Sequence, residues 1–277
     1  AIIEDARDKV AALVGAKDAA VIFTSGATES CHLALFGAAE GSLEGEQSRS
    51  TRIFVSAIEH KAVIASANRL AERFPWIHVT EIPVTLEGVL DTEALRVALR
   101  EGKGRTLVAV MAANNETGVV QPIADVSRLV REAGALLLVD AVPAAGKIEL
   151  DFGLCDYMVL SGQKLGGPMG AGALLARANA DESSVPLQPQ LAGGGQQKGL
   201  RAGSENLSGI ADIAAAAPSL RGGEGERARI VHLRDHFEAA LKQAAPDVVI
   251  FGAGAERLCS TSNFAIPGLA AETALMG

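Results

Sequence analysis

Continuous apolar runs alternate with segments of helical character along the first 180 or so residues. The runs lie at residues 19–24, 52–57, 78–84, 106–113, 135–141, 157–161 and 171–176. Such runs are typical of strands that are buried on both faces, and these strands form parallel sheets covered by helices. Asp91 is a typical cap for one intervening helix, at residues 92–100. The pattern therefore predicts an α/β fold with a mostly parallel seven-stranded sheet flanked by helices.

The character of the sequence changes after about residue 218. Gly and Pro residues at 218–227 are typical of a boundary. Beyond them we expect an amphipathic helix at 228–246 and a strand at 247–254. The sequence thus predicts a large domain at residues 1–218 and a partial, smaller α+β domain at 219–277. Because the chain begins and stops inside helical patterns, we expect it to be truncated at both ends.

The composition argues against several classes of function. The net charge is −8 and no basic run stands out, which disfavours nucleic acid as the main partner. We find no signal peptide and no stretch of about 18 uncharged apolar residues, so we expect no membrane partner. Three cysteines without a CxxC pair indicate free thiols in a reducing cytoplasm. His232 and His236 have no evident third ligand, and we expect a polar helix face there and no metal.

Open parallel sheets bind ligands at the carboxyl ends of their strands, so the residues that follow each strand are the first candidates for a binding site. After the first strand, Gly26, the Thr28 hydroxyl and the start of a helix favour a bound phosphate. After the second, the ring of His60 could stack on a planar cofactor. Asn114 and Asn115 follow the fourth and could bond a ring substituent or a substrate. Taken singly, a capped turn, a surface histidine and a polar turn explain these residues as well or better.

Two charged residues stand where charge is costly. Asp140 ends a buried strand, and its carboxylate needs a partner there, either a protonated ring nitrogen, a helix cap or a salt bridge. Lys164 follows residues 157–161, where the chain leaves the core. A desolvated lysine near other cations has a lowered pKa, and its free amine can attack a carbonyl to form a Schiff base. A lysine that only extends along the surface is the alternative.

Together these residues describe a single site. It combines a phosphate cradle, a stacking ring, an amide, a buried acid and an amine nucleophile, all on strand ends. Pyridoxal 5′-phosphate requires this combination, because its phosphate must be anchored, its ring nitrogen kept protonated and its aldehyde held by an amine. The sequence therefore predicts pyridoxal 5′-phosphate as the cofactor.

The order and spacing of seven motifs resemble those of the cysteine desulfurases, which belong to the class-V aminotransferase group of pyridoxal-phosphate enzymes of fold type I. The motifs are "FTSGATES", "EHKAV", "NNETGVVQPI", "VDAVPAAGKIELD", "SGQKLGGPMGAGAL", "GGGQQKGLRAGSEN" and "TSNFAIPGLAAETAL". The resemblance covers essentially the whole chain. It implies fold type I and a homodimer with shared sites.

The resemblance also implies a role for each site residue. Lys164 is the catalytic lysine that binds the cofactor covalently, and His60 stacks on the ring and handles protons. Asp140 pairs with the pyridine nitrogen, and Asn115 contacts the ring near its hydroxyl and the substrate. The cofactor phosphate is assigned to Ala27, Thr28, Ser161, Gln163 and, in the neighbouring subunit, to Ser204.

The chain departs from the family pattern in three respects. Pro143 stands where the family usually has a glutamine that bonds the ring hydroxyl, and Gln163 stands where it usually has a histidine. Both changes could weaken cofactor binding. The chain also ends before the loop whose cysteine takes the sulfur, and before a substrate-binding arginine. Cys31, Cys155 and Cys259 lack the context of that loop, and we expect Cys31 to be structural.

These inferences predict a cysteine desulfurase, a sulfurtransferase that converts L-cysteine to L-alanine and holds the sulfur as a persulfide for iron–sulfur cluster assembly. The expected partners are L-cysteine, a second copy of the chain and sulfur-acceptor or scaffold proteins, and the expected location is the cytoplasm. The chain as given is predicted not to complete sulfur transfer. Two alternatives stay open: another class-V enzyme, such as an aminotransferase or selenocysteine lyase, and a catalytically impaired dimeric scaffold.

Overall fold

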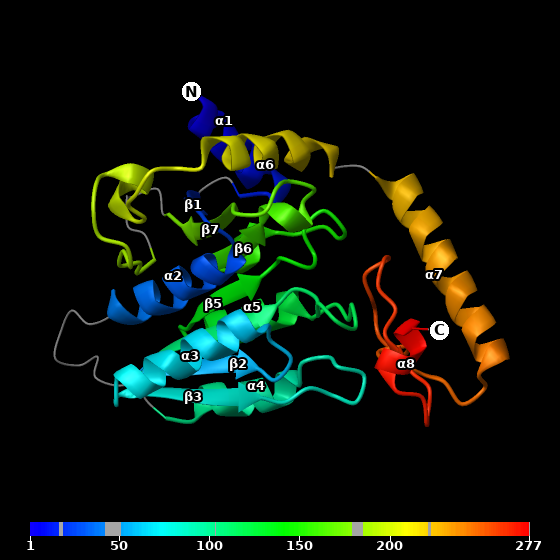
Figure 1. Cartoon of the computed structure of the whole chain (residues 1–277). Helices are drawn as coiled ribbons and strands as arrows, with labels where there is room; N and C mark the ends of the chain where they lie inside the picture. Colours follow the sequence, from blue (N-terminus) through cyan, green and yellow to red (C-terminus); the bar gives the residue numbers. More distant parts are fainter. Residues whose placement is uncertain (17–18, 42–50, 103, 179–184, 221–222, 277) are drawn as a thin grey trace.

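A seven-stranded sheet forms the centre of the molecule, in the strand order β1-β7-β6-β5-β4-β2-β3 (Figure 1). The computed structural model describes residues 1–16, 19–41, 51–102, 104–178, 185–220 and 223–276. The strands are β1 (Ala19–Thr24), β2 (Thr51–Ser56), β3 (Ile77–Ile82), β4 (Arg105–Met111), β5 (Leu136–Asp140), β6 (Tyr157–Ser161) and β7 (Gly172–Arg177). All neighbours are parallel except β7, which is antiparallel to both β1 and β6. The predicted mostly parallel sheet is confirmed, with strand ends within two residues of expectation.

Helices cover both faces of this sheet. On the sheet lie α1 (Ile2–Leu13), α2 (Ala27–Glu40), α3 (Lys61–Arg73), α4 (Thr92–Arg100), α5 (Ile123–Glu132) and α6 (Leu207–Ser219), and two more helices, α7 (Glu224–Ala244) and α8 (Ala271–Met276), follow in the chain. α2 and α3 pack into one hydrophobic cluster, and α1, α4, α5 and α6 pack into another. The sheet is therefore the middle of three layers. Within the described residues, no helix combines the length and apolar character needed to cross a membrane.

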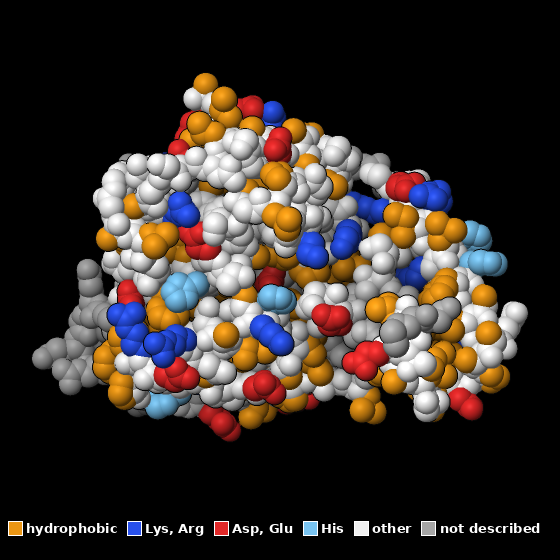
Figure 2. Space-filling model, viewed as in Figure 1, with side chains coloured by type: hydrophobic (Ala, Val, Ile, Leu, Met, Phe, Trp, Pro, Cys, Tyr) orange, Lys and Arg blue, Asp and Glu red, His pale blue; other side chains and the backbone are white. Residues whose placement is uncertain are grey.

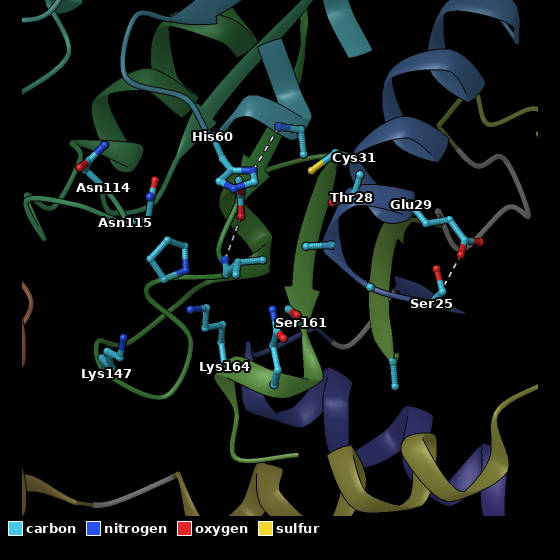
Figure 3. Close-up of a pocket in the computed structure, with 18 of the residues that line it drawn as sticks. Ser25, Thr28, Glu29, Cys31, His60, Asn114, Asn115, Lys147, Ser161 and Lys164 are labelled. Carbon is cyan, nitrogen blue, oxygen red and sulfur yellow. Dashed lines mark hydrogen bonds between the residues drawn. The ribbon is translucent and has the colours of Figure 1, made fainter. Parts of the chain in front are cut away.

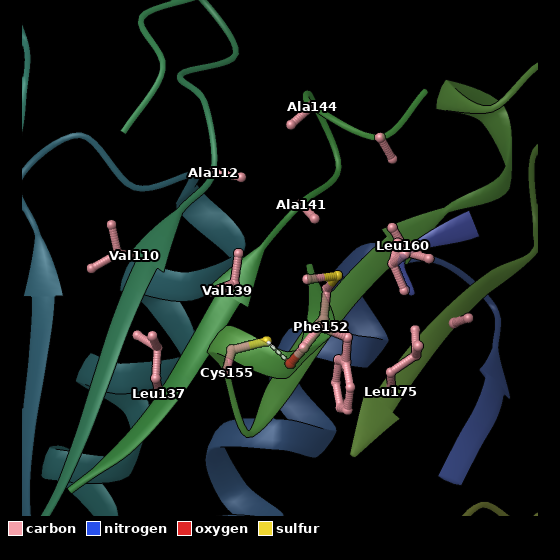
Figure 4. Packing of buried hydrophobic residues seen from close by; sticks show 14 of the residues in the cluster. Val110, Ala112, Leu137, Val139, Ala141, Ala144, Phe152, Cys155, Leu160 and Leu175 are labelled. Atoms are coloured by element: carbon pink, nitrogen blue, oxygen red, sulfur yellow. Dashed lines mark hydrogen bonds between the residues drawn. The ribbon is translucent and has the colours of Figure 1, made fainter. Parts of the chain in front are cut away.

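Each central strand contributes side chains to the hydrophobic clusters on both faces of the sheet, because successive side chains of a strand point to opposite faces. In β4, Val108 and Val110 pack in one cluster, whereas Leu107 and Ala109 pack in the other. Figure 4 shows part of the first cluster, where Phe152 lies against the sheet beside the strand residues. Burial on both faces explains why the strands are apolar without interruption. Most charged side chains lie at the surface, and Figure 2 shows acidic and basic groups interspersed on one face.

Predictions for two local features had different outcomes. Asp91 caps α4 as expected, since its Oδ1 accepts hydrogen bonds from the backbone N–H groups of Glu93 and Ala94 at 3.0 and 2.9 Å. The strand predicted at 247–254 is wrong over most of its length. Only Val249–Ile250 forms a strand, β8, which pairs with β9 (Phe264–Ala265). The chain turns at Gly252, whose φ of +68° is incompatible with an extended strand.

The sequence pattern provides no expectation for α6, which packs with α1 against the sheet through Ile210 and Ile213. Asn206 caps α6, because its Oδ1 accepts a hydrogen bond from the Gly209 N–H at 3.2 Å. α7 then leads away from the sheet (Figure 1). The predicted boundary after residue 218 falls at the end of α6, and the division into two domains stays a prediction.

After β8, the chain returns to the carboxyl edge of the sheet. The backbone N–H of Val120 donates to the Glu256 carbonyl, and that of Leu258 donates to the Gly118 carbonyl, both at 2.8 Å. These two bonds hold residues 256–258 beside the loop that follows β4. They also bring the C-terminal segment next to the strand ends where the site residues were predicted.

A bidentate ion pair holds the same segment to α7. Arg257 donates to the two carboxylate oxygens of Glu238 at 2.7 and 2.9 Å, and the side chains are only 7% and 9% exposed. Breaking a buried pair leaves an uncompensated charge, which typically costs about 3 kcal/mol or more. The position of residues 256–258 therefore depends on this pair.

We expect Glu238→Ala to lower the free energy of unfolding by about 3 kcal/mol, because Arg257 loses its only carboxylate partner within the described residues. Urea unfolding measures this loss, and hydrogen exchange should accelerate at the amides of Val120 and Leu258. The matched control is Glu226→Ala, which breaks an exposed pair with Arg229 and should change little. Equal effects of the two substitutions would contradict the structural role of the buried pair.

Candidate active site

A cavity of about 380 Å³ opens at the carboxyl ends of β2, β4, β5 and β6, next to the start of α2. Its walls come from the loops after those strands, the first turn of α2, and Leu258 and Thr261 of the C-terminal segment. Figure 3 shows His60, Thr28, Ser161 and Lys164 around this common space. Side chains far apart in the sequence thus face one volume, as expected for an open parallel sheet.

The structure brings together eight of the nine residues predicted to form the site. Those that line the cavity are Ala27, Thr28, His60, Asn115, Asp140, Ser161, Gln163 and Lys164. Ser204 does not line it, and instead borders a small neighbouring pocket with Ser25 and Arg201. The role expected for Ser204 concerns a neighbouring subunit. The chemical roles of all nine residues stay predictions.

The first turn of α2 borders the cavity, and its backbone N–H groups have no side-chain cap among the described residues. Gly26 is the N-cap of α2 at φ 155°, a backbone conformation that side chains other than glycine rarely adopt, and it makes no side-chain cap. The first N–H groups of a helix lack partners within that helix, and the helix dipole favours an anion there. Gly172 of β7 lies so close that a Cβ would meet the Cα of Gly26 at 2.7 Å. This close packing fixes the turn in place.

One acidic residue at the same turn is neutralised by a distant arginine. The Ser25 N–H donates to Glu29 Oε2 at 2.8 Å, and Arg201 donates to Glu29 at 2.7 and 3.2 Å. Partial burial raises the pKa of Glu29, but the hydrogen bonds from Arg201 and Ser25 outweigh it and hold the pKa below its ordinary value. Because its charge is paired, Glu29 does not prevent the turn from binding an anion.

The ring of His60 is fixed by the start of α3. Its Nδ1 accepts a hydrogen bond from the Ala62 N–H at 3.1 Å, so His60 is the N-cap of that helix (Figure 3). A neutral imidazole carries its hydrogen on the nitrogen that is not an acceptor. Nε2 is therefore the nitrogen that can donate. The same residue thus caps a helix and lines the cavity wall.

Asp140 is a buried carboxyl with no salt bridge in the described part of the chain. Asp140 is only 4% exposed, and its Oδ1 accepts a hydrogen bond from the Val142 N–H at 3.0 Å. Burial raises the pKa of Asp140, and the Val142 bond and the nearby His60 oppose that rise in part. A single hydrogen bond does not compensate a buried carboxylate. The site thus contains an acid that a cationic ligand group would stabilise.

Lys164 lines the cavity, but its side chain is not desolvated. It follows β6 in a short 3₁₀ turn, Gly162–Lys164, and its side chain is exposed to the open cavity. Gly162 packs against α6 so tightly that a Cβ would meet Ile213 Cγ1 at 2.7 Å. The turn is therefore held rigidly while the lysine itself reaches into solvent. Of the two alternatives for Lys164, a desolvated amine and a lysine that extends along the surface, the exposed side chain agrees with the second.

Sequence reasoning missed two further residues of the site. Lys147, half-buried, lines the cavity, and burial together with the charge of Lys164 lowers its pKa. Glu59 lies behind the wall and is buried with Asp140. Both stand inside quoted motifs, "VDAVPAAGKIELD" and "EHKAV", so the motifs were the signal that could have found them. Cys31 also lines the cavity and is fully buried, in line with the structural role expected of it.

The chain matches known proteins along nearly its whole length. The model of the family described as "Aminotransferase class-V" matches residues 1–276. An "IscS-like cysteine desulfurase" of Mycobacterium tuberculosis is 38% identical over 99% of this chain and 69% of its own length. A "Cysteine desulfurase" of Cereibacter sphaeroides is 39% identical over 98% of this chain and 67% of its own. The chain spans about two thirds of the length of these curated relatives.

Comparison with solved structures gives the same result. A "NIFS-LIKE PROTEIN" superposes with a TM-score of 0.88 at 33% identity, covering 98% of this chain and 72% of that one. DndA of Streptomyces lividans has a TM-score of 0.86 at 33% identity, covering 99% of this chain and 75% of that one. The resemblance on the sequence motifs is thereby confirmed. The chain belongs to the class-V aminotransferase family and, within it, to the cysteine desulfurases.

Proposed function

We propose that this chain is the cofactor-binding part of a cysteine desulfurase that uses pyridoxal 5′-phosphate and acts on L-cysteine. One observation carries the proposal: the unpaired carboxyl of Asp140, the amine of Lys164 and the start of α2 all border one cavity. The chain's relatives named cysteine desulfurase support the same activity.

The residues present fit this cofactor. The cavity of about 380 Å³ is in the range of small-molecule sites. The uncapped start of α2 suits a phosphate, and the buried acid suits a protonated pyridine nitrogen. His60 offers a flat ring in the same wall. The fit thus rests on an anion site, a cation site and a stacking surface in one volume.

Each residue has a separate task in this proposal. When bound, pyridoxal phosphate supplies an electron sink that weakens the bonds at the substrate α-carbon. Asp140 would keep the pyridine nitrogen protonated, and the Nζ of Lys164 would bind the cofactor aldehyde and move the proton at the α-carbon of the substrate. Nε2 of His60 would be the nitrogen that donates or accepts a proton in the cavity, because Nδ1 accepts the Ala62 N–H.

Two substitutions relative to the family alter contacts to the cofactor. Pro143 lines the cavity and has no side-chain donor for the ring hydroxyl, which leaves the amide of Asn115 for that role. That amide now donates to Glu116 Oε1 at 2.7 Å, so it must exchange this partner for the ring. Gln163 is exposed at the cavity and can donate to a phosphate without carrying charge.

The three cysteines are poorly placed to receive sulfur. Burial, with the nearby charges of Asp140 and Glu59, raises the pKa of Cys31 well above its ordinary value, and burial raises that of Cys155 as well. A protonated thiol is a much weaker nucleophile than a thiolate. Cys259 is partly exposed and does not line the cavity. We therefore propose that the acceptor cysteine of the working enzyme is not one of these three.

The proposal extends to partners and location. A second copy of the chain would bring Ser204 to the neighbouring phosphate, and sulfur-acceptor or scaffold proteins for iron–sulfur cluster assembly would receive the sulfur. Three free thiols support a reducing cytoplasm as the location. The relatives named IscS support the link to these partners.

We expect the purified chain to bind pyridoxal phosphate with a visible absorbance band, and reduction with borohydride to fix the cofactor covalently to Lys164. Lys164→Ala should abolish the covalent product. Lys147→Ala is the matched control, because it removes an amine from the same cavity and should keep the product. A colourless wild-type chain that ignores added cofactor would contradict the proposal and favour a scaffold function.

We expect Asp140→Asn to have opposite effects on the two forms of the protein. Cofactor affinity should fall by roughly 10- to 100-fold, because the ring nitrogen loses its counter-charge. The free energy of unfolding without cofactor should rise by about 1 kcal/mol at pH 8, because a carboxyl whose pKa is raised by burial is destabilising in its charged form, above that pKa. Cofactor titration and urea unfolding measure the two effects, and a variant that binds as tightly as wild type would rule out the pairing.

With cofactor and L-cysteine, residues 1–277 should form no protein persulfide, and with an added thiol reductant they should form no L-alanine above the level of a Lys164→Ala control. The physical reason is that the two buried thiols have raised pKa values and Cys259 lies off the cavity. Persulfide labelling and alanine quantification are the measurements. Turnover that disappears in Cys31→Ser or Cys259→Ser would show that one of these thiols accepts sulfur after all.

A further inference from the structure

A second buried acid lies next to the site, behind its wall. Glu59 follows β2, directly before His60, and is only 6% exposed. Its Oε1 accepts a hydrogen bond from the Met111 N–H at 2.6 Å. Its Oε2 is buried and has no hydrogen-bond partner among the described residues. A buried carboxylate with a single hydrogen-bond donor lowers the stability of the fold, so the presence of this side chain needs an explanation.

The hydrogen bond of Glu59 ties the loop that carries His60 to the end of β4. Met111 is the last residue of β4 and lies directly beside Asp140 in the sheet register. A second bond runs the same way, from Asn114 Nδ2 to the Ile58 carbonyl at 3.1 Å. These two bonds fix residues 58 and 59 from one side. The N-cap bond from Ala62 to His60 fixes the ring from the other side.

The groups around Glu59 disfavour a negative charge on it. Burial and the charge of Asp140 on β5 raise the pKa of Glu59 well above its ordinary value. The other titratable groups of this cluster are the thiol of Cys31 on α2, which also feels both acids, and His60, which lies near Asp140. Two neighbouring buried carboxyls cannot both be charged at low cost. Asp140 borders the open cavity, and the Val142 N–H and His60 oppose the rise of its pKa, whereas Glu59 lies behind the wall, so the proton belongs on Glu59.

We propose that Glu59 is a positioning residue that holds the His60 loop against β4 as a neutral carboxylic acid and leaves the negative charge of the pair on Asp140. The charge assignment stands without a cofactor, whereas its use, presenting one anion to a protonated ring nitrogen, rests on the proposed function. A carboxylic acid kept neutral at pH 7 by an apolar site is known chemistry in enzymes. The Met111 bond needs only an acceptor oxygen, which the neutral form supplies.

The first test measures stability without cofactor. A carboxyl whose pKa is raised by folding stabilises the fold fully below its unfolded pKa of about 4.3, and this contribution is lost as the pH rises toward its folded pKa. Glu59→Gln keeps an oxygen for Met111 but cannot ionise. The melting temperature of Glu59→Gln minus that of wild type should therefore rise by about 2–6 °C between pH 5 and pH 8.

The control for this test is Glu81→Gln, on an exposed position of β3, where the difference should not change with pH. A flat or falling difference for Glu59→Gln would overturn the proposal. If that variant does not fold, infrared spectroscopy of wild type with 13C-labelled glutamate carboxyls decides instead. We expect a protonated-acid band from glutamate at pH 7, and its absence would overturn the proposal equally.

The second test measures the positioning role through cofactor binding. Glu59→Gln should bind pyridoxal phosphate within about threefold of wild type, whereas Glu59→Ala, which frees the His60 loop, should bind about tenfold more weakly or worse. Equal loss in both variants would mean that the charge of Glu59 matters, and would contradict its neutrality. A wild type that binds no cofactor would refute the proposed function, and the stability test would still decide the charge of Glu59.

Discussion

The buried carboxyl of Asp140, which forms no salt bridge in the described part of the chain, is the constraint on which the site depends. The residue is placed by β5, a strand that is buried on both faces and paired on both edges. A folded protein retains such an acid at the expense of stability. The expense is understandable if a ligand brings the missing positive charge, and the cavity above Asp140 has the size to admit one.

The rest of the cavity follows from the way parallel strands end together. β2, β4, β5 and β6 stop at one edge, so the loops that follow them meet although they lie far apart in the sequence. Rigid features then set each side chain in place: the cap at His60, the packed glycine at 162 and the turn at Gly26. Glu59 ties the loop of His60 to β4 from behind the wall. The positions of the site residues are thus fixed mainly by contacts to the backbone, and less by contacts between the reactive side chains.

The sequence predicted the parts that depend on local pattern. Apolar runs placed the strands, and residues after strands placed the cavity, because both follow from burial and from sheet geometry. It could not predict Glu59, whose acceptor role depends on Met111, 52 positions away. The sequence left the exposure of Lys164 open for a similar reason, since distant segments decide whether solvent reaches this side chain. The strand expected at 247–254 failed because the turn at Gly252 overrides the local preference for strand.

The most direct test of the central claim is a crystal structure of the chain grown with pyridoxal phosphate. The account predicts the phosphate at the start of α2, the ring nitrogen within hydrogen-bond distance of Asp140, and the aldehyde carbon joined to Nζ of Lys164. A cofactor bound with its ring nitrogen away from Asp140, or bound outside this cavity, would contradict the account.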